Sequence, residues 1–240
     1  MNWVTLVLAI VAALIGVGLL WWRARVGSEL ALMKSTQPST AKDAVGKPAG
    51  TVVALAGVLK TDAPLTSEFA QKPCIYYRAL TEREVEKVEI GTDGKRETRR
   101  EFETEIDVQR HAPCLLEDAS GTVAIDFEGA KVEALQVHRR YESQAGVASL
   151  VGSLVGVSGT TLGHRYTEWI IEAGVPVYVL GTALAGGKVG KTPKQTFVVS
   201  IKSEAERERS LGRTRMWQMI SAVIALIIAA GLAYVSFATD

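Results

Sequence analysis

Two neighbouring stretches decide the fold: CIYYRALTEREVEKVEI at residues 74–90 and TRREFETEIDVQR at residues 98–110. Apolar and charged residues alternate along both stretches, and this period of two is typical of a β-strand with one buried face. The turn signal Asp93-Gly94 lies between them. The pattern therefore predicts an antiparallel ribbon.

The charges distinguish two registers of this ribbon, because opposed side chains on neighbouring strands interact. A two-residue turn opposes glutamate to glutamate at two positions. A shift by one residue, which leaves a three-residue loop, instead opposes Lys87 to Glu101 and Glu89 to Arg99. We favour the shifted register. The ribbon is expected to be a solvated hairpin or, alternatively, a partner surface.

Further short apolar stretches on both sides of the ribbon predict more strands. They lie at residues 51–58, 114–117, 122–127, 131–137, 166–172, 175–183 and 195–202. Many short strands joined by glycine-containing turns are typical of an antiparallel barrel or sandwich. We expect this β domain to span residues 51–203, after a short helix and linker at residues 23–50.

The two ends of the chain differ from this middle. Residues 3–22 and 216–238 contain no charged side chain, and a helix of about 20 apolar residues is long enough to cross a bilayer. They predict transmembrane helices at residues 1–22 and 216–238, with a cleaved signal peptide as the alternative for the first. The expected fold class is a membrane-anchored α+β chain in which two transmembrane helices flank a mainly antiparallel β domain.

Positive charges near the apolar segments predict their orientation. Arg23 and Arg25 follow the first segment, and Arg213 and Arg215 end a basic stretch at residues 204–215 before the second. Because such charges are enriched on the cytoplasmic side, we expect a two-pass protein with a cytoplasmic central domain. The expected membrane is the bacterial plasma (inner) membrane, with the mitochondrial outer membrane as the alternative. The four arginines are candidate membrane-proximal residues on the lipid bilayer.

The charge balance excludes one class of partner. The chain has 27 Lys and Arg residues against 26 Asp and Glu residues, so no overall field attracts nucleic acid.

An apolar, glycine-rich stretch at residues 146–163 carries no charge. Its small residues, Gly152 and Gly156 among them, would allow close helix approach or contact with a membrane surface. A flexible loop or a core helix on the sheet remains the alternative.

The chain has two cysteines and three histidines, and their spacing matches no zinc motif. We therefore expect no metal and no cofactor. The residues with a possible functional role are Cys74, Tyr76, His164 and Glu168. If the protein is an enzyme, its site would draw on Glu168, His164, His111 and Cys114. Glu168 has two structural alternatives: an outward strand residue, or a buried acceptor for backbone donors.

Several runs resemble the GIDE ("beside a membrane", BAM) domain of the MULAN family. These runs are Gly57-Val58, Pro73-Cys74-Ile75-Tyr76-Tyr77-Arg78, Tyr166-Thr167-Glu168-Trp169-Ile170-Ile171 and Gly174-Val175-Pro176-Val177-Tyr178-Val179-Leu180-Gly181. The resemblance implies a β-rich domain between two transmembrane helices. Eukaryotic members are E3 ubiquitin ligases of the outer mitochondrial membrane with a zinc-binding RING after the second helix. Because this chain stops at Asp240, we expect a RING-less form similar to prokaryotic relatives.

The resemblance implies a membrane-anchored interaction, scaffolding or sensing module. It implies a protein partner, for which a LemA-like membrane protein is one suggestion, and a homo-oligomer stays open. The alternatives are an enzyme with an unrecognised site, or an E3 ubiquitin transferase label carried by homology without the catalytic RING. We expect no ubiquitin transfer.

Overall fold

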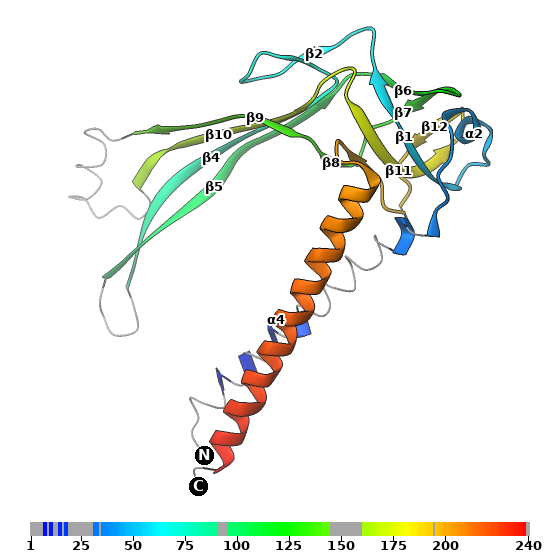
Figure 1. Cartoon of the computed structure of the whole chain (residues 1–240). Coiled ribbons are helices and arrows are strands. Elements are labelled where there is room, and N and C mark those ends of the chain that lie inside the picture. The colour runs from blue at the N-terminus through cyan, green and yellow to red at the C-terminus, as the bar shows by residue number, and fades with distance from the viewer. Residues whose placement is uncertain are drawn as a thin grey trace. The chain divides into compact units, whose positions relative to one another are not determined.

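The computed structural model describes residues 7–8, 10–11, 14–15, 17–18, 31–33, 35–90, 96–144, 160–193 and 195–238 (Figure 1). The chain divides into two compact units. One comprises Met1–Pro38, Val52–Ala54 and Lys202–Asp240, and the other comprises Ser39–Thr51 and Leu55–Ile201. The second unit contains the four-stranded sheet and all of the seven-stranded sheet except Val52–Ala54 of β1.

The described residues are mostly in strands. In chain order the elements are α2 (Ala41–Gly46), β1 (Val52–Lys60), β2 (Leu65–Thr66), β3 (Pro73–Cys74), β4 (Tyr76–Ile90), β5 (Arg96–His111), β6 (Cys114–Asp118), β7 (Gly121–Ile125), β8 (Lys131–Glu133), β9 (Leu135–Ser143), β10 (Thr160–Ile171), β11 (Pro176–Leu184), β12 (Lys188–Gly190), β13 (Val198–Ser200) and α4 (Glu204–Ala238). The longest strands, β4 and β5, have 15 and 16 residues.

The first sheet closes into a barrel. Its strand order is β1-β6-β7-β12-β11-β13-β8, and β1 also pairs with β11. Among the described strands, β1, β6, β7, β12 and β11 therefore form a closed ring of five, and β13 and β8 extend the sheet from β11. Two hydrogen bonds of 2.8 Å help to close the ring, from Gly50 N to the Ala183 carbonyl and from Ala183 N to the Thr51 carbonyl. Closure removes exposed strand edges from the ring.

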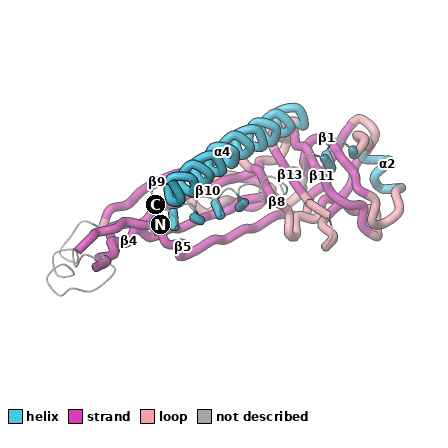
Figure 2. The backbone as a smooth tube through the Cα atoms, turned by 90° about the horizontal axis from the view of Figure 1, so that it is seen from below, coloured by secondary structure: helices cyan, strands magenta, loops and turns pink. Residues whose placement is uncertain are grey.

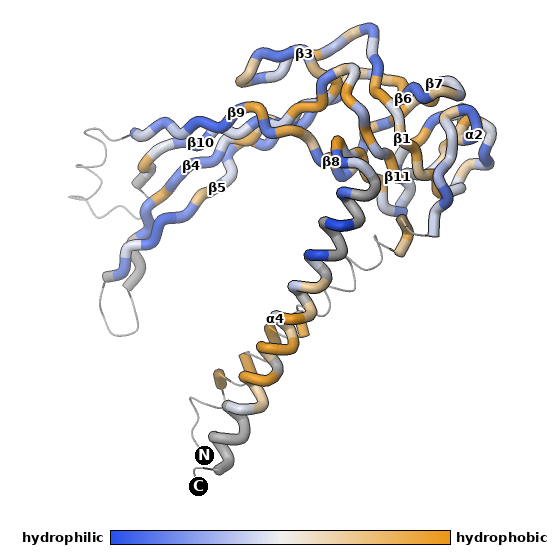
Figure 3. The backbone as a smooth tube through the Cα atoms, in the orientation of Figure 1, coloured by the Kyte–Doolittle hydropathy of each residue, from blue (hydrophilic) through white to orange (hydrophobic). Residues whose placement is uncertain are grey.

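The second sheet has four antiparallel strands in the order β5-β4-β10-β9. Figure 2 shows these strands running side by side. Hydrophobic residues are frequent in barrel strands such as β6 and β11, whereas β4 and β5 carry long hydrophilic stretches (Figure 3).

The observed register of β4 and β5 differs from the predicted one. Lys87 lies opposite Arg99 and Glu89 lies opposite Glu97, whereas we favoured Glu101 and Arg99 as their partners. A β-bulge between Thr81 and Glu82 shifts the ladder. The Lys87 ammonium still forms an ion pair with the Glu101 carboxylate, because long side chains reach diagonal neighbours across a strand pair. The predicted ion pair between Lys87 and Glu101 therefore forms, although the predicted register of the two strands does not.

Strand β11 is the most deeply buried strand of the barrel. Its seven residues from Val177 to Ala183 are all buried, which matches a strand covered on both faces. Gly181 lies within this run, and a Cβ atom at its position would come within 2.8 Å of the Val189 and Phe197 side chains. Only glycine therefore lets these side chains pack directly against the β11 backbone.

Helix α2 lies inside the predicted linker. The Thr40 hydroxyl accepts a 3.1 Å hydrogen bond from Asp43 N and caps the helix. The Asp118 carboxylate at the end of β6 accepts a 2.7 Å bond from Ala41 N. Ala41 and Ala44 are buried. These contacts hold a six-residue helix that would be marginal in isolation.

The predicted fold class, a membrane-anchored α+β chain with two transmembrane helices, is wrong. The structure is mostly β, and within the described ranges no helix has the length and apolar character needed to span a bilayer. The predicted two-pass location with a cytoplasmic central domain is wrong for the same reason. The second apolar segment was predicted as a helix over residues 216–238. In the structure, α4 begins earlier, at Glu204, and includes the charged stretch before Met216. Much of the first apolar segment lies outside the described residues.

We predict that Gly181→Ala lowers the free energy of unfolding by about 1–3 kcal/mol, because an added methyl group overpacks the barrel. Gly46→Ala is the control, since no atom lies within 4 Å of the Cβ position there. Chemical denaturation of both variants measures the difference. Equal stability of the Gly181 variant and the control would show that the barrel accommodates the methyl group.

Candidate functional site

Glu168 of β10 is a carboxylate with no exposed surface. Its Oε1 accepts a 2.9 Å hydrogen bond from Phe69 N, and its Oε2 accepts a 2.8 Å bond from Ala70 N. Both donors lie in the loop between β2 and β3. A buried charge is costly unless it is hydrogen-bonded, so these backbone groups explain how Glu168 is tolerated. It is the buried backbone acceptor that the sequence left as one of its alternatives.

The β2–β3 loop needs this anchor because its hairpin is minimal. Each strand has two residues, and a short isolated hairpin is marginally stable in water. Ser67 N donates to the Lys72 carbonyl at 2.9 Å, and Lys72 N donates to Ser67 Oγ at 3.1 Å. Gln71 adopts a left-handed conformation with φ of 53°, which lets the chain reverse direction.

The loop packs onto one face of the four-stranded sheet. The Phe69 ring meets Tyr166 edge to face, with centroids 5.5 Å apart, and lies 5.8 Å from His138. Beneath it is an apolar cluster formed by Cys74, Tyr77, Ala79 and Ile170 with the partly buried Leu65, Phe69, Val108 and Val137. The hydrogen bonds of Glu168 to Phe69 and Ala70 therefore hold the β2–β3 loop, with its Phe69 ring, over this cluster.

Both cysteines are buried and free. Burial raises the pKa of the Cys74 thiol to about 11, with smaller contributions from the negative charges of Glu168 and Glu172. Burial alone raises the pKa of Cys114 to about 12. The thiolate is the nucleophilic form, so neither cysteine is prepared for covalent catalysis.

His164 lies on the same face of β10 as Glu168, with Tyr166 between them, because every second residue of a strand shares a face. Its Nε2 is 3.3 Å from Glu105 Oε2, and its ring stacks near Tyr166 at 6.4 Å. Glu105 also lies 3.6 Å from the Arg83 guanidinium. His164 thus belongs to a cross-strand charge network, and the structure shows no hydrogen bond between it and Glu168.

Tyr76 faces the opposite side of the sheet. Its hydroxyl donates to Gln109 Oε1 at 3.2 Å, and its ring stacks on Phe127 with centroids 5.7 Å apart. Burial is the main cause that raises the pKa of Tyr76 to about 12. The His111 ring also stacks on Phe127, with centroids 5.7 Å apart. These contacts connect the four-stranded sheet to the segment after β7.

The remaining predicted site residues are Arg23, Arg25, Gly152, Gly156, Arg213 and Arg215. Arg23, Arg25, Gly152 and Gly156 lie outside the described residues, as does most of the stretch at residues 146–163. Arg213 is exposed on α4. Arg215 is also in α4, and its side chain is outside the described part of the structure.

The sequence reading missed a second set of side chains, on the sheet face opposite Glu168. Arg78 donates two hydrogen bonds to Asp107, at 2.8 and 2.7 Å, and its guanidinium lies 5.5 Å from the Trp169 ring centroid. These hydrogen bonds are the main cause that lowers the pKa of Asp107. In the sequence, the alternation along β4 could have shown that Arg78 lies on the opposite face from Tyr77 and Ala79.

A second arginine repeats this arrangement further along the sheet. Arg165 donates to both Glu82 oxygens, at 2.7 and 2.8 Å, and lies 3.8 Å from the centroid of Phe102. The Tyr141 hydroxyl, opposite Arg165 in the ladder, donates to the Glu84 carboxylate. We call the set Arg78, Phe102, Tyr141, Arg165 and Trp169 the aromatic–arginine face.

Metal binding finds no support within the described ranges, where no group of three or more His, Cys, Asp or Glu side chains is placed to hold an ion.

Comparison with known proteins gives one match. The GIDE family model, described as an E3 ubiquitin ligase, matches residues 82–233, which is more than half of the chain. No curated protein and no solved structure matches it. The matched range begins in β4 and includes β5, β9 and β10 in full.

We predict that Glu168→Gln lowers the free energy of unfolding by about 1–3 kcal/mol, because an amide offers one acceptor oxygen to two backbone donors. The matched control is Glu172→Gln, whose carboxylate is 44% exposed and 3.8 Å from Lys72 Nζ. An exposed pair of this kind contributes about 0–1 kcal/mol. Equal losses in both variants, measured by urea denaturation, would contradict the anchoring role.

We also predict that neither cysteine of the folded chain reacts measurably with Ellman's reagent at pH 8, whereas both react after unfolding. With a pKa of about 11, the thiolate fraction of Cys74 is on the order of one in a thousand at this pH. The raised pKa leaves stability undiminished below about pH 9 and lowers it as the pH rises from about 9 to 11. Reaction of a folded-state thiol at the rate of the unfolded chain would refute this assignment.

Proposed function

Because the chain belongs to the GIDE family of E3 ubiquitin ligases, we propose that it acts as a protein-interaction module of that family. Scaffolding of a partner is the role that this proposal assigns to the four-stranded sheet. The observation that carries it is the aromatic–arginine face. Phe102, Tyr141, Arg165 and Trp169 all lie within the range that matches the family.

The composition of this face favours protein binding. Phe102 and Tyr141 are 42% and 45% exposed. Trp169 is half-buried and lies opposite Arg78 in the pairing of β10 with β4. Trp, Tyr and Arg are the residue types most often found at the energetic centres of interfaces. Their presence on neighbouring strands supports the choice of this face.

The geometry also reduces the entropic cost of binding. Each arginine is held by a two-bond contact to a carboxylate, to Asp107 or to Glu82. Arg165 is further stacked on Phe102. Side chains that are already fixed lose little rotamer freedom when a partner binds.

The alternative, an enzyme that uses the polar residues of the opposite face, has less support. Both oxygens of Glu168 accept backbone hydrogen bonds, and the buried thiols have raised pKa values. These groups contribute to the fold in ways that do not require a substrate.

The test is site-specific photo-crosslinking in the cells that produce the protein. A benzophenone amino acid replaces Phe102 in one variant and Leu115, a barrel residue of β6 with 44% exposure, in the matched control. We predict a discrete light-dependent protein adduct from position 102 that is absent from position 115. Adding Tyr141→Ala and Trp169→Ala should reduce its yield at least tenfold, since truncation of central interface residues costs roughly 2 kcal/mol or more.

The same adducts from both positions, or an adduct unaffected by the two alanines, would contradict the proposal. Circular dichroism and thermal melts of each variant establish that the fold is retained.

A further inference from the structure

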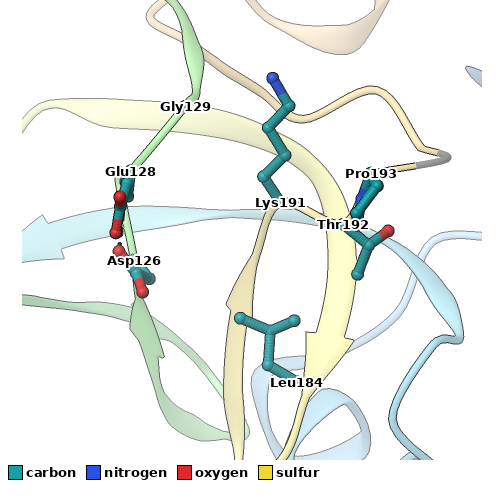
Figure 4. A pocket seen from close by; sticks show the side chains of 7 residues that line it. All are labelled: Asp126, Glu128, Gly129, Leu184, Lys191, Thr192 and Pro193. Atoms are coloured by element: carbon teal, nitrogen blue, oxygen red, sulfur yellow. Dashed lines mark hydrogen bonds between the residues drawn. The ribbon is translucent and has the colours of Figure 1, made fainter.

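A hollow of about 340 Å³ opens on the barrel side of the second unit. It is lined by Asp126, Glu128, Gly129, Leu184, Lys191, Thr192 and Pro193 (Figure 4). These residues belong to the segments that follow β7, β11 and β12 or end them, and none belongs to the aromatic–arginine face. Its volume lies at the lower end of the range of about 300–1,000 Å³ that is usual for small-molecule sites.

Strand pairing explains why these residues meet. β7 and β12 run parallel, with Ile125 opposite Val189, so the residues just after both strands lie at the same edge. Asp126 N donates to the Val189 carbonyl at 2.9 Å. Asp126 Oδ1 then accepts a 3.1 Å bond from Glu128 N, which fixes the turn that carries both carboxylates.

Two glycines shape the walls. A Cβ atom at Gly190 would lie 2.8 Å from Leu184 Cδ1 and 3.3 Å from Asp126 Cβ. A Cβ atom at Gly129, which has φ of +67°, would lie 2.8 Å from Lys191 Cδ. The lysine stem thus rests on one glycine while Leu184 and Asp126 approach the other, and larger residues at either position would displace a lining side chain.

The charges around the hollow are of both signs. Within the described part of the chain, the Lys191 ammonium forms no ion pair with Asp126 or Glu128, although all three line the same space. Figure 4 shows the two acidic side chains across from Thr192 and Pro193, with Leu184 below. Leu184 and Pro193 provide apolar parts of the lining.

We propose that this hollow binds a small zwitterion of the amino-acid class. The cationic group of the ligand lies between Asp126 and Glu128, its carboxylate meets Lys191 and the Thr192 hydroxyl, and its aliphatic part packs on Leu184 and Pro193. Carboxylates and ammonium groups form charge-assisted hydrogen bonds with groups of opposite charge. The site is separate from the proposed protein-binding face and goes beyond that function.

The test is an NMR titration of the purified full chain with L-arginine, followed at the backbone amides of Gly129 and Thr192. Agmatine, which has the same guanidinium and carbon chain but no carboxylate, is the matched ligand control. We expect saturable shifts of both amides with L-arginine, and binding of agmatine that is about tenfold weaker because it leaves Lys191 unpaired.

Two variants test the two ends of the site. Lys191→Met keeps an alkyl stem over Gly129 and removes the ammonium, and Asp126→Asn keeps the acceptor of the Glu128 turn and removes a charge. Each should weaken L-arginine binding about tenfold. Lys188→Met changes an exposed lysine of β12 outside the hollow and should leave binding unchanged.

Equal binding of L-arginine and agmatine, or binding that responds to Asp126→Asn but not to Lys191→Met, would overturn the zwitterion proposal in favour of a site for cations alone. Absence of saturable shifts, or shifts that persist in both variants, would show that the hollow is only solvated surface. None of these outcomes affects the cross-linking result at Phe102, so the two proposals succeed or fail independently.

Discussion

The need of a buried carboxylate for hydrogen-bond donors is the constraint on which the candidate site depends. Glu168 has no exposed surface, and its two donors come from Phe69 and Ala70, nearly a hundred residues earlier in the chain. An unpaired charge at this depth would cost several kcal/mol. The hairpin β2–β3 must therefore stay on the sheet, and with it the Phe69 ring and the buried cluster around Cys74.

This constraint separates the two faces of the four-stranded sheet. On the Glu168 face, the loop covers the apolar cluster and the charged residues beyond it pair across strands, as His164 does with Glu105. On the opposite face, Phe127 of the segment after β7 stacks on Tyr76, whereas Phe102 and Tyr141, further along the sheet, stay exposed beside fixed arginines. The binding role that we propose concerns the exposed part of this second face.

The sequence predicted most longer strands, because alternation over five or more residues is a strong signal. β4, β5, β6, β7 and β11 lie where the pattern placed strands. β2, β3 and β12 have two or three residues, too few for any periodicity. The closure of β1 on β11 depends on pairing between distant segments. The register of β4 and β5, which also contains a bulge between Thr81 and Glu82, is one that charge alone could not determine. The apolar ends led to a membrane topology that the structure contradicts.

Residue type predicted part of the site. Glu168 was identified as unusual because it is an acidic residue among apolar neighbours. Its partners could not be predicted, because they are backbone N–H groups of a distant loop, and every non-proline residue has such a group. Arg165 and Trp169 share a strand face at even spacing, so their common orientation could have been inferred. Their stacking and ion-pair partners lie on β4 and β5, and only the tertiary pairing reveals them.

The most direct test of the central claim, that Glu168 is a structural acceptor holding the loop to the sheet, is hydrogen exchange at single amides. The account predicts that the Phe69 and Ala70 amides of the folded chain exchange slowly, with protection close to that of the paired amides of β10. Fast exchange at both positions, at the rate of an exposed loop, would contradict it, because the carboxylate would then be buried without the donors that explain its burial.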